Sequence, residues 1–198
     1  MNPGWEIKMI DRENCPVEIY GDTPQAESDV IRLGLMFKYG GVWADSTLLC
    51  MQSLDDWVHE ATEPTGYWMY RGWYSRPASW FFVFKPGHYV LEKWVESCKK
   101  YWETGGTSKN NYNWMDNLLK PLLDTDPKIK ESWDKVPYLS SEDEGQAGML
   151  SGKVAEDSPE LKQILKTRPP RVLKLDKSAI DENSVNSNGY YAIQLITS

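Results

Sequence analysis

The chain has 198 residues, enough for one domain with a sizeable core, and its net charge is −7. An acidic chain without a basic block argues against nucleic acid as the main partner, although a bound cation can still bring an anionic small ligand to such a chain. Aromatic residues make up 13% of the sequence, a high share that favours heavy packing or surfaces on which sugars or bases stack.

The first elements lead up to a helix. Residues 5–10 alternate between apolar and polar side chains and predict a strand, and residues 11–22 are rich in turn formers. A helix is expected over residues 24–39, with Thr23 as its N-cap, a proline at its first position and Gly40 as its stop. Its apolar stripe consists of Val30, Leu33 and Phe37.

Short strands follow this helix. Residues 42–44 predict a strand, and residues 48–51 are expected to continue the same sheet after a break. Residues 55–60 form one or two helical turns, and residues 67–74 are rich in aromatic side chains but too interrupted by glycine for a long element. The continuous apolar run at 79–84 predicts a central strand.

The second half of the chain predicts helices and a late strand. Apolar residues recur at helical spacing over 91–102, and the glycines at 105–106 end this helix. Another helix begins near Tyr112, and Pro121 is expected to kink or end it. The acidic, Gly-rich residues 140–159 suit a mobile loop or lid. Residues 161–165 predict a helix, and residues 172–175 and 190–196 predict strands.

Three widely spaced cysteines, Cys15, Cys50 and Cys98, show neither a disulfide framework nor zinc-ligand spacing. With an N-terminus that lacks a basic region followed by an apolar one, they predict a reducing compartment. We therefore expect a cytoplasmic protein, with association at a membrane surface left open. No apolar run approaches the roughly 20 residues of a transmembrane helix, so none is expected.

Residues 28–47 carry the densest functional signal. Asp29 and Arg32 are three residues apart, so their side chains neighbour each other on the predicted helix. Asp45 follows the short strand, at the kind of edge where open α/β sheets present ligands. Each feature also has an ordinary interpretation: a solvated ion pair, a turn aspartate, and a plain helix stop at residues 40–41.

The combination is more specific than its parts. Ser-Asp-x-x-Arg at 28–32, followed by Tyr-Gly-Gly-x-Trp-x-Asp at 39–45, resembles the signature of the capsular polysaccharide synthesis family. That family is related to glycosyltransferases that carry a D-x-D motif after a Tyr-Gly-Gly turn. Similar outlying segments occur at 2–6, 79–81, 85–87, 101–102 and 172–175.

The resemblance implies an α/β fold of the GT-A-like, Rossmann-like kind, with a single mixed sheet flanked by helices in one domain over residues 1–198. It implies the transfer of a hexose from a nucleotide-diphosphate sugar, with a uridine donor expected, to a hydroxyl of a glycan or lipid-linked glycan. Retention of the anomeric configuration is favoured.

The resemblance also implies roles for the residues of this stretch. Asp45 would be the catalytic carboxylate and would hold Mn²⁺ or Mg²⁺, hard cations that prefer oxygen ligands and offset charge on a leaving diphosphate. Asp29 would contact hydroxyls of the donor, and Arg32 would steady that site or the phosphates. The other expected donor-binding residues are Gly40, Gly41, Trp43 and Ser46. For Trp43, core packing stays open beside stacking on the donor.

Two departures from the family pattern motivate an alternative. Thr47 stands where the second carboxylate is expected, so a hydroxyl would replace one formal charge in the metal site. The chain also begins after the strand and helix with which such proteins normally open, which predicts a sheet without its usual first strand. The alternative is a truncated or non-catalytic module that binds a nucleotide sugar or a glycan. A nucleotidyltransferase would need a basic Gly-rich loop near the N-terminus, which the sequence lacks.

Candidate acceptor contacts are aromatic, with one carboxylate. Trp80 begins the apolar strand, and Tyr70 and Trp73 belong to a cluster expected in a loop, where aromatic faces could pack against sugar C–H groups. Asp116 lies on a predicted helix and is a candidate acceptor-side base. The alternatives are core packing for the aromatic residues and a solvated helix position for the carboxylate.

Overall fold

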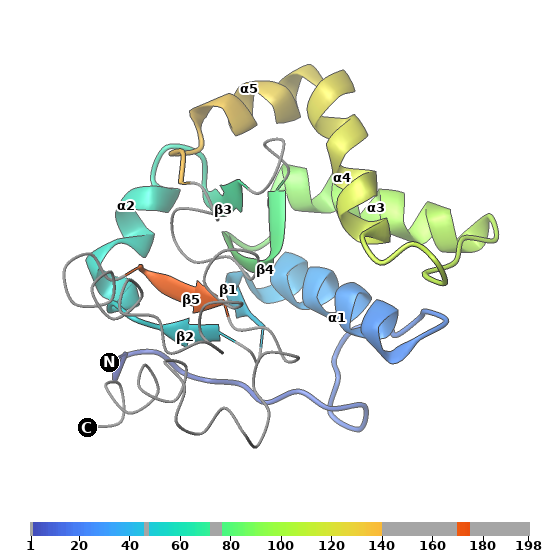
Figure 1. Ribbon diagram of the computed structural model, residues 1–198, viewed down its shortest axis with the longest axis horizontal. Coiled ribbons are helices and arrows are strands. Elements are labelled where there is room, and N and C mark those ends of the chain that lie inside the picture. The colour runs from blue at the N-terminus through green and yellow to red at the C-terminus, as the bar shows by residue number, and fades with distance from the viewer. Residues whose placement is uncertain (1, 46–47, 72–76, 140–169, 175–198) are drawn as a thin grey trace, which may run out of the picture.

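The computed structural model describes residues 2–45, 48–71, 77–139 and 170–174, which form a mixed α/β arrangement with two small antiparallel sheets (Figure 1). The helices are α1 (Pro24–Tyr39), α2 (Val58–Thr62), α3 (Tyr89–Glu103), α4 (Trp114–Thr125) and α5 (Pro127–Lys135), with a 3-10 turn η1 (Leu54–Asp56). The strands are β1 (Gly41–Ala44), β2 (Leu48–Cys50), β3 (Tyr67–Arg71), β4 (Pro77–Phe84) and β5 (Val172–Lys174).

Helix α1 begins and ends where the sequence predicts. The Thr23 hydroxyl oxygen accepts a hydrogen bond from the Ala26 N–H at 3.2 Å, which caps the first turn. Gly40 ends the helix with φ +67°, and a Cβ at this position would lie 2.7 Å from Pro86. Both the backbone conformation and the close packing therefore require glycine here.

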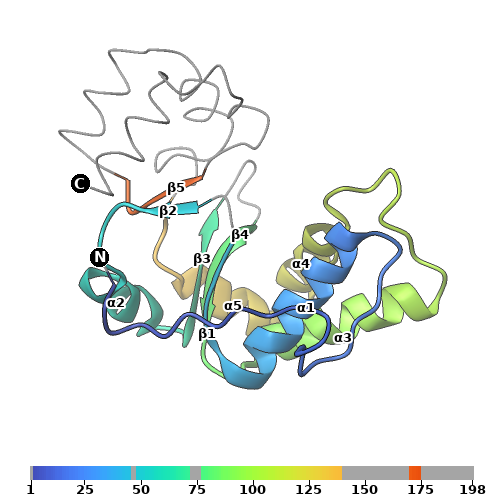
Figure 2. The same ribbon diagram turned by 90° about the horizontal axis from the view of Figure 1, so that it is seen from below.

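The three-stranded sheet has the order β1-β4-β3, so the apolar run of β4 is the central strand, as predicted. Both of its pairings are antiparallel, with Ala44 opposite Phe81 on one side and Trp68 opposite Val83 on the other. Helix α2 packs on one face of this sheet, and α1 and α4 pack on the other with α3 behind them (Figure 2). Because β4 is covered on both faces, its side chains are almost continuously buried.

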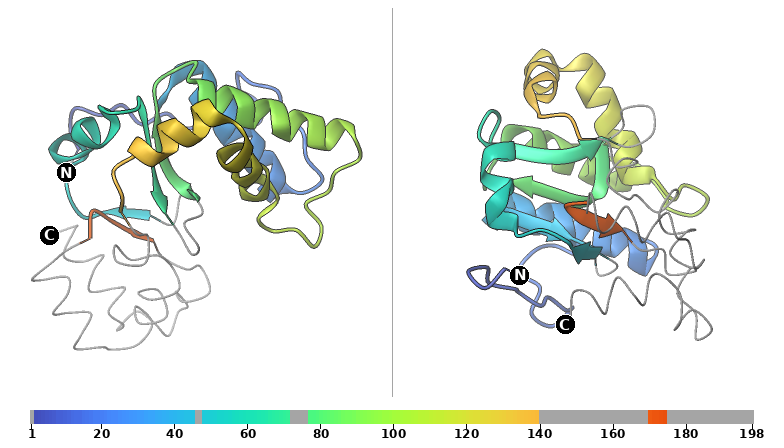
Figure 3. Two further views of the ribbon diagram at one scale, coloured as in Figure 1. Left: turned by 90° about the horizontal axis from the view of Figure 1, so that it is seen from above. Right: turned by 60° about the vertical axis from the view of Figure 1, so that its left-hand side comes forward.

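Strands β2 and β5 form a separate two-stranded sheet, in which Leu48 lies opposite Lys174 (Figure 3). The Leu48 N–H donates to the Asp45 carbonyl at 3.0 Å, so the backbone turns at the end of β1 and leaves the first sheet. The expectation that residues 48–51 continue that sheet is therefore wrong. Within the described ranges, the expected single mixed sheet is replaced by two antiparallel ones.

The N-terminal segment is not the strand that its alternation predicted. Residues 5–10 have no strand partner among the described residues, and Ile7 and Met9 are each 88% exposed. Side chains hold the segment instead: the Trp5 indole donates to Asp55 at 2.8 Å, and the Asn2 amide oxygen accepts from the Leu54 N–H at 2.7 Å. Alternation predicts a strand only where another strand is available to pair.

The predicted helix over 91–102 is confirmed as α3. The expectation that Pro121 could end the next helix is wrong. Helix α4 continues past this proline to Thr125. Asp126 then caps α5, a helix that the sequence interpretation missed, by accepting from the N–H groups of Lys128 and Ile129.

No helix in the described part combines the length and apolar character needed to cross a membrane. The loop expected at 140–159, the helix at 161–165 and the strand at 190–196 lie outside the described residues.

The core is built largely from aromatic side chains, which supports the heavy-packing interpretation of the composition. The largest fully buried rings come from both sheet and helices: Trp68, Trp94, Trp114, Tyr67, Tyr70, Phe81, Phe82 and Phe84. Trp114 stacks on Tyr101 with ring centroids 5.7 Å apart and meets Trp102 edge-on at 5.2 Å. This packing fixes the start of α4 against the C-terminal part of α3.

The burial of His88 predicts that the stability of the fold depends on pH. Its ring lies near Tyr67 and Phe84, its Nδ1 accepts from the Val90 N–H at 3.3 Å, and its Nε2 lies 3.0 Å from the Thr65 carbonyl oxygen, to which it can donate. These partners suit the neutral ring with its proton on Nε2, and burial lowers the pKa of His88.

Because the unfolded chain binds this proton more readily, the contribution of a neutral His88 is complete above the unfolded pKa of about 6.5 and decreases as the pH falls below it. We expect the urea midpoint of unfolding to fall between pH 7.5 and pH 5.5. In His88→Asn, which keeps a capping side chain but has no imidazole, the decrease should be smaller. Equal decreases in both proteins would show that other groups cause it.

Candidate functional site

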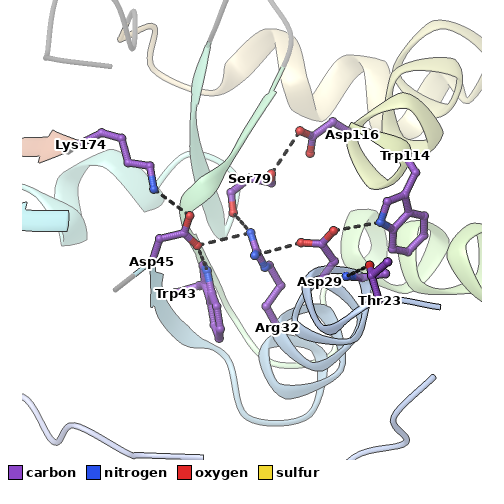
Figure 4. A network of polar contacts seen from close by, with 10 residues as sticks. Thr23, Asp29, Arg32, Trp43, Asp45, Ser79, Trp114, Asp116 and Lys174 are labelled. Carbon is purple, nitrogen blue, oxygen red and sulfur yellow. Dashed lines mark hydrogen bonds and ion pairs between the residues drawn. The ribbon is translucent and has the colours of Figure 1, made fainter. Parts of the chain in front are cut away.

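A cluster of charged and aromatic side chains lies where the end of β1 meets α1, β4, the first turn of α4 and β5 (Figure 4). We call it the Asp45 cluster. Its members are Asp29, Arg32, Trp43, Asp45, Ser79, Trp114, Asp116 and Lys174.

Asp45 is held by backbone and side-chain contacts. Its N–H donates to the Trp80 carbonyl at 3.0 Å, which extends the β1–β4 pairing by one residue. Its Oδ1 accepts from the Trp43 indole at 3.0 Å and lies 3.4 Å from the Arg32 Nη1, while its Oδ2 lies 3.0 Å from the Lys174 Nζ. The side chain is 24% exposed, so part of it reaches solvent.

Arg32 is enclosed at the centre of the cluster. It is 9% exposed, and no other charged residue in the described part of the chain is buried. Its Nη2 pairs with Asp29 at 2.9 Å, its Nη1 donates to the Ser79 carbonyl at 2.9 Å, and its guanidinium lies 5.0 Å from the centre of the Trp43 ring. A guanidinium has the planar fork needed to bridge two carboxylates in this way. Arg32 thus fixes the positions of Asp29 and Asp45 relative to each other.

Asp29 joins α1 to α4. One oxygen pairs with Arg32, and the other accepts from the Trp114 indole at 2.9 Å. Burial raises the pKa of Asp29, and the charge of Arg32 opposes that rise. Since each carboxylate oxygen has two lone pairs, Asp29 retains acceptor capacity for a ligand hydroxyl.

Asp116 and Ser79 connect the cluster to α4 and β4. Asp116 lies in the first turn of α4, and its Oδ2 accepts from the Ser79 hydroxyl at 3.2 Å. The carbonyl of the same serine accepts from Arg32. Asp116 is therefore linked to the Asp45 cluster rather than being a solvated helix carboxylate.

The sequence interpretation did not name Ser79, Trp114 or Lys174 as members of this cluster, and Lys174 is the most distant of them in the chain. Residues 172–175 were interpreted as a strand, and β5 confirms this over Val172–Lys174, but nothing in the sequence indicates its partner. The pairing of β5 with β2 brings the Lys174 ammonium to Asp45, 129 residues away in the chain. An apolar strand that ends in a lysine is the signal available, and it does not specify a site.

Several expected contacts lie elsewhere. Tyr70 is in strand β3 rather than a loop, is 0% exposed, and stacks on the buried Trp80 with centroids 4.9 Å apart. Both rings are buried in the core, which favours the packing alternative over a contact with an acceptor. Ser46, Thr47 and Trp73 lie outside the described residues.

The paired glycines are also separated from the cluster. Gly41 begins β1, four residues before Asp45, a separation of about 13 Å at about 3.3 Å per residue. Gly40 packs closely against Pro86 and the Phe84 carbonyl. The two glycines join α1 to β1, and their approach to a donor stays a prediction. Trp43, in contrast, contacts both Asp45 and Arg32.

The charge balance of the cluster favours a cation. With Asp29, Asp45 and Asp116 ionised against Arg32 and Lys174, the net charge is −1. A bare diphosphate would meet this negative field unfavourably, whereas a divalent cation would be attracted and would reverse its sign.

Asp45 is the carboxylate of the cluster that a hard divalent cation would use, with water and substrate completing its shell. In the described ranges, no three His, Cys, Asp or Glu side chains gather in a metal-holding group. Mg²⁺ in particular is usually bound through one or two carboxylates together with waters and substrate phosphates. The partly exposed Asp45 carboxylate suits that mode, provided that its contact with Lys174 opens.

Comparison with known proteins agrees with the central signature. A family model described as capsular polysaccharide synthesis protein matches residues 22–189. This range includes every member of the Asp45 cluster, from Asp29 to Lys174. No curated protein and no solved structure matches the chain.

Proposed function

The chain belongs to the family of capsular polysaccharide synthesis proteins, and from this premise we propose that it is a glycosyltransferase of capsule biosynthesis. The proposed reaction transfers a hexose from a nucleotide-diphosphate sugar, with uridine as the expected base, to a hydroxyl of a glycan or lipid-linked glycan. We propose retention of the anomeric configuration.

One observation supports this proposal most. The signature residues Asp29, Arg32 and Asp45, which are spread over α1 and the end of β1, meet in one ion-paired cluster. A solvated helix pair would not be expected to bury its arginine against a distant strand end. Each carboxylate also keeps lone pairs with which to accept hydrogen bonds from a ligand.

We assign the donor side of the site to the residues of α1 and β1. Asp45 would hold Mn²⁺ or Mg²⁺, with Thr47 as a further proposed ligand, and such a cation would supply charge compensation for the leaving diphosphate. Asp29 would accept hydrogen bonds from donor hydroxyls. Arg32 would act as a positioning residue that keeps both carboxylates in place, since its guanidinium is enclosed by protein partners.

Asp116 is the proposed acceptor-side carboxylate. It lies across Ser79 from Arg32 and is bonded to the Ser79 hydroxyl at 3.2 Å. Retaining transfer does not demand a strong protein base, so the role proposed for Asp116 is to orient an acceptor hydroxyl through a hydrogen bond.

We also propose a GT-A-like fold in a single domain, which the sequence signature supports. The free thiols of Cys15, Cys50 and Cys98 support a reducing, cytoplasmic compartment as the place of the reaction.

Calorimetric titration with UDP tests the proposal. With Mn²⁺ present, we expect saturable binding with a Kd of about 1 mM or tighter, the upper range of typical KM values. Without a divalent cation, binding should be much weaker because the cluster is negatively charged. A thermal-shift screen of nucleotide sugars then identifies the donor, and its hydrolysis or transfer measures turnover. The absence of UDP binding in both conditions would contradict the proposed donor.

A second candidate function is a nucleotide-sugar or glycan-binding module without turnover. The observation that favours it is that both Asp45 oxygens are engaged by the chain itself, through Arg32, Trp43 and Lys174. This candidate predicts that UDP or a nucleotide sugar binds but that neither hydrolysis nor transfer follows. Measured turnover with any nucleotide sugar would rule it out.

A further inference from the structure

We propose that Lys174 is a diphosphate-binding residue, which pairs with Asp45 in the free protein and turns to the phosphates of the donor when a divalent cation occupies Asp45. This inference rests on the proposed function and adds a residue from the C-terminal strand to the donor site.

The position of Lys174 permits such an exchange. Its backbone is fixed by the pairing of β5 with β2, where it lies opposite Leu48, three residues after Asp45. Its ammonium lies 3.0 Å from the Oδ2 of Asp45, and its side chain is 16% exposed. A lysine has a flexible four-carbon stem, so its charge can move by a few ångströms while the strand stays in place.

The other cation of the cluster is less suited to this role. Arg32 is fixed in the interior by Asp29, by the Ser79 carbonyl and by the Trp43 ring. Turning its guanidinium to a phosphate would leave Asp29 as a buried, uncompensated charge, which is costly. Lys174 carries a compact point charge on a flexible stem, which is a common way of binding phosphate.

The charges give the exchange its direction. Lys174 is attracted to Asp45 while no divalent cation is bound to that carboxylate. A divalent cation at Asp45 would repel the ammonium, and the diphosphate bound to that cation would attract it. Lys174 therefore competes with the cation for Asp45 and cooperates with it in holding the donor.

These two relations predict opposite effects for one substitution. In Lys174→Met, Mn²⁺ alone should bind about 5-fold more tightly, because a competing ion pair of about 1 kcal/mol is removed. In the presence of saturating Mn²⁺, UDP should bind about 10-fold more weakly, because one charge-assisted hydrogen bond to phosphate is lost. Calorimetry measures both constants in the full chain, and Lys174→Arg should restore most of the UDP affinity.

The matched control is Lys99→Met, which removes a lysine from an exposed ion pair with Glu18 outside the Asp45 cluster and should change neither constant. If Lys174→Met weakens the binding of Mn²⁺ and UDP together, or leaves UDP binding unchanged, the inference is wrong even though wild-type binding supports the proposed function. If the wild type itself binds no UDP with Mn²⁺, the proposed function fails, and the inference fails with it. Unchanged melting temperatures would show that the variants are folded.

Discussion

Asp45→Asn is expected to lower turnover by about 10²-fold or more at saturating Mn²⁺, the usual scale for losing one electrostatic stabiliser of a transition state. The amide keeps the size of the side chain and an oxygen that can accept from the Trp43 indole, so the local backbone should stay in place. It removes the negative charge by which Asp45 would hold a cation. The measurement is the rate of donor hydrolysis or transfer, with the nucleotide sugar that the wild type uses, as a function of Mn²⁺ concentration.

Asp124→Asn is the matched control for this experiment. Asp124 forms an exposed ion pair with Lys120 on α4, outside the Asp45 cluster, so its replacement should leave turnover unchanged. An Asp45→Asn protein that keeps wild-type turnover with an unaltered Mn²⁺ dependence would refute the assignment of Asp45 as the cation-holding carboxylate.

Arg32→Met is expected to cause the largest loss of stability among the cluster variants, about 3–5 kcal/mol in the free energy of unfolding. The substitution keeps an apolar stem of similar length but leaves Asp29 and Asp45 facing each other with little solvent. It also leaves the Ser79 carbonyl without the donor that it has at 2.9 Å. At about 2–4 °C per kcal/mol for a chain of this size, the melting temperature should fall by about 10 °C.

A double-mutant cycle tests the cause of this loss. Adding Asp29→Asn removes one of the two uncompensated charges while keeping an acceptor for the Trp114 indole. The double variant should therefore lose less stability than the sum of the two single losses, by about 0.5–3 kcal/mol. Additive losses would show that Arg32 acts mainly through packing on Trp43. Lys120→Met, at an exposed pair, should change stability by about 1 kcal/mol or less.

The elements that the sequence predicts well are those whose determinants lie within a few residues. The cap at Thr23 and the stop at Gly40 define α1, and the apolar run after Pro77 defines the central strand. For the same reason, the contact between Asp29 and Arg32 follows from their spacing on one helix. The Asp-Pro pair at 126–127 is a comparable local signal, an N-cap followed by a proline at the first position of α5.

The contacts that the sequence does not predict depend on pairing between distant segments. Residues 48–50 and 172–174 each read as a short apolar strand, yet neither indicates that the two pair in a sheet of their own. Tyr70 was placed in a loop because glycine and proline follow it, whereas pairing with β4 buries it in a strand. Tertiary partners decide both cases, and local patterns do not encode them.

The distance of 129 residues between Asp45 and Lys174 has a consequence for how the protein is made. At the usual translation rate of about 5–20 residues per second, the ribosome adds Lys174 about 10 s after Asp45. Helix α1 and strand β1 precede Asp45 in the nascent chain, so Arg32 can neutralise Asp45 before Lys174 is added. The arginine would then serve as the early counter-ion of the growing chain, and the lysine would join last.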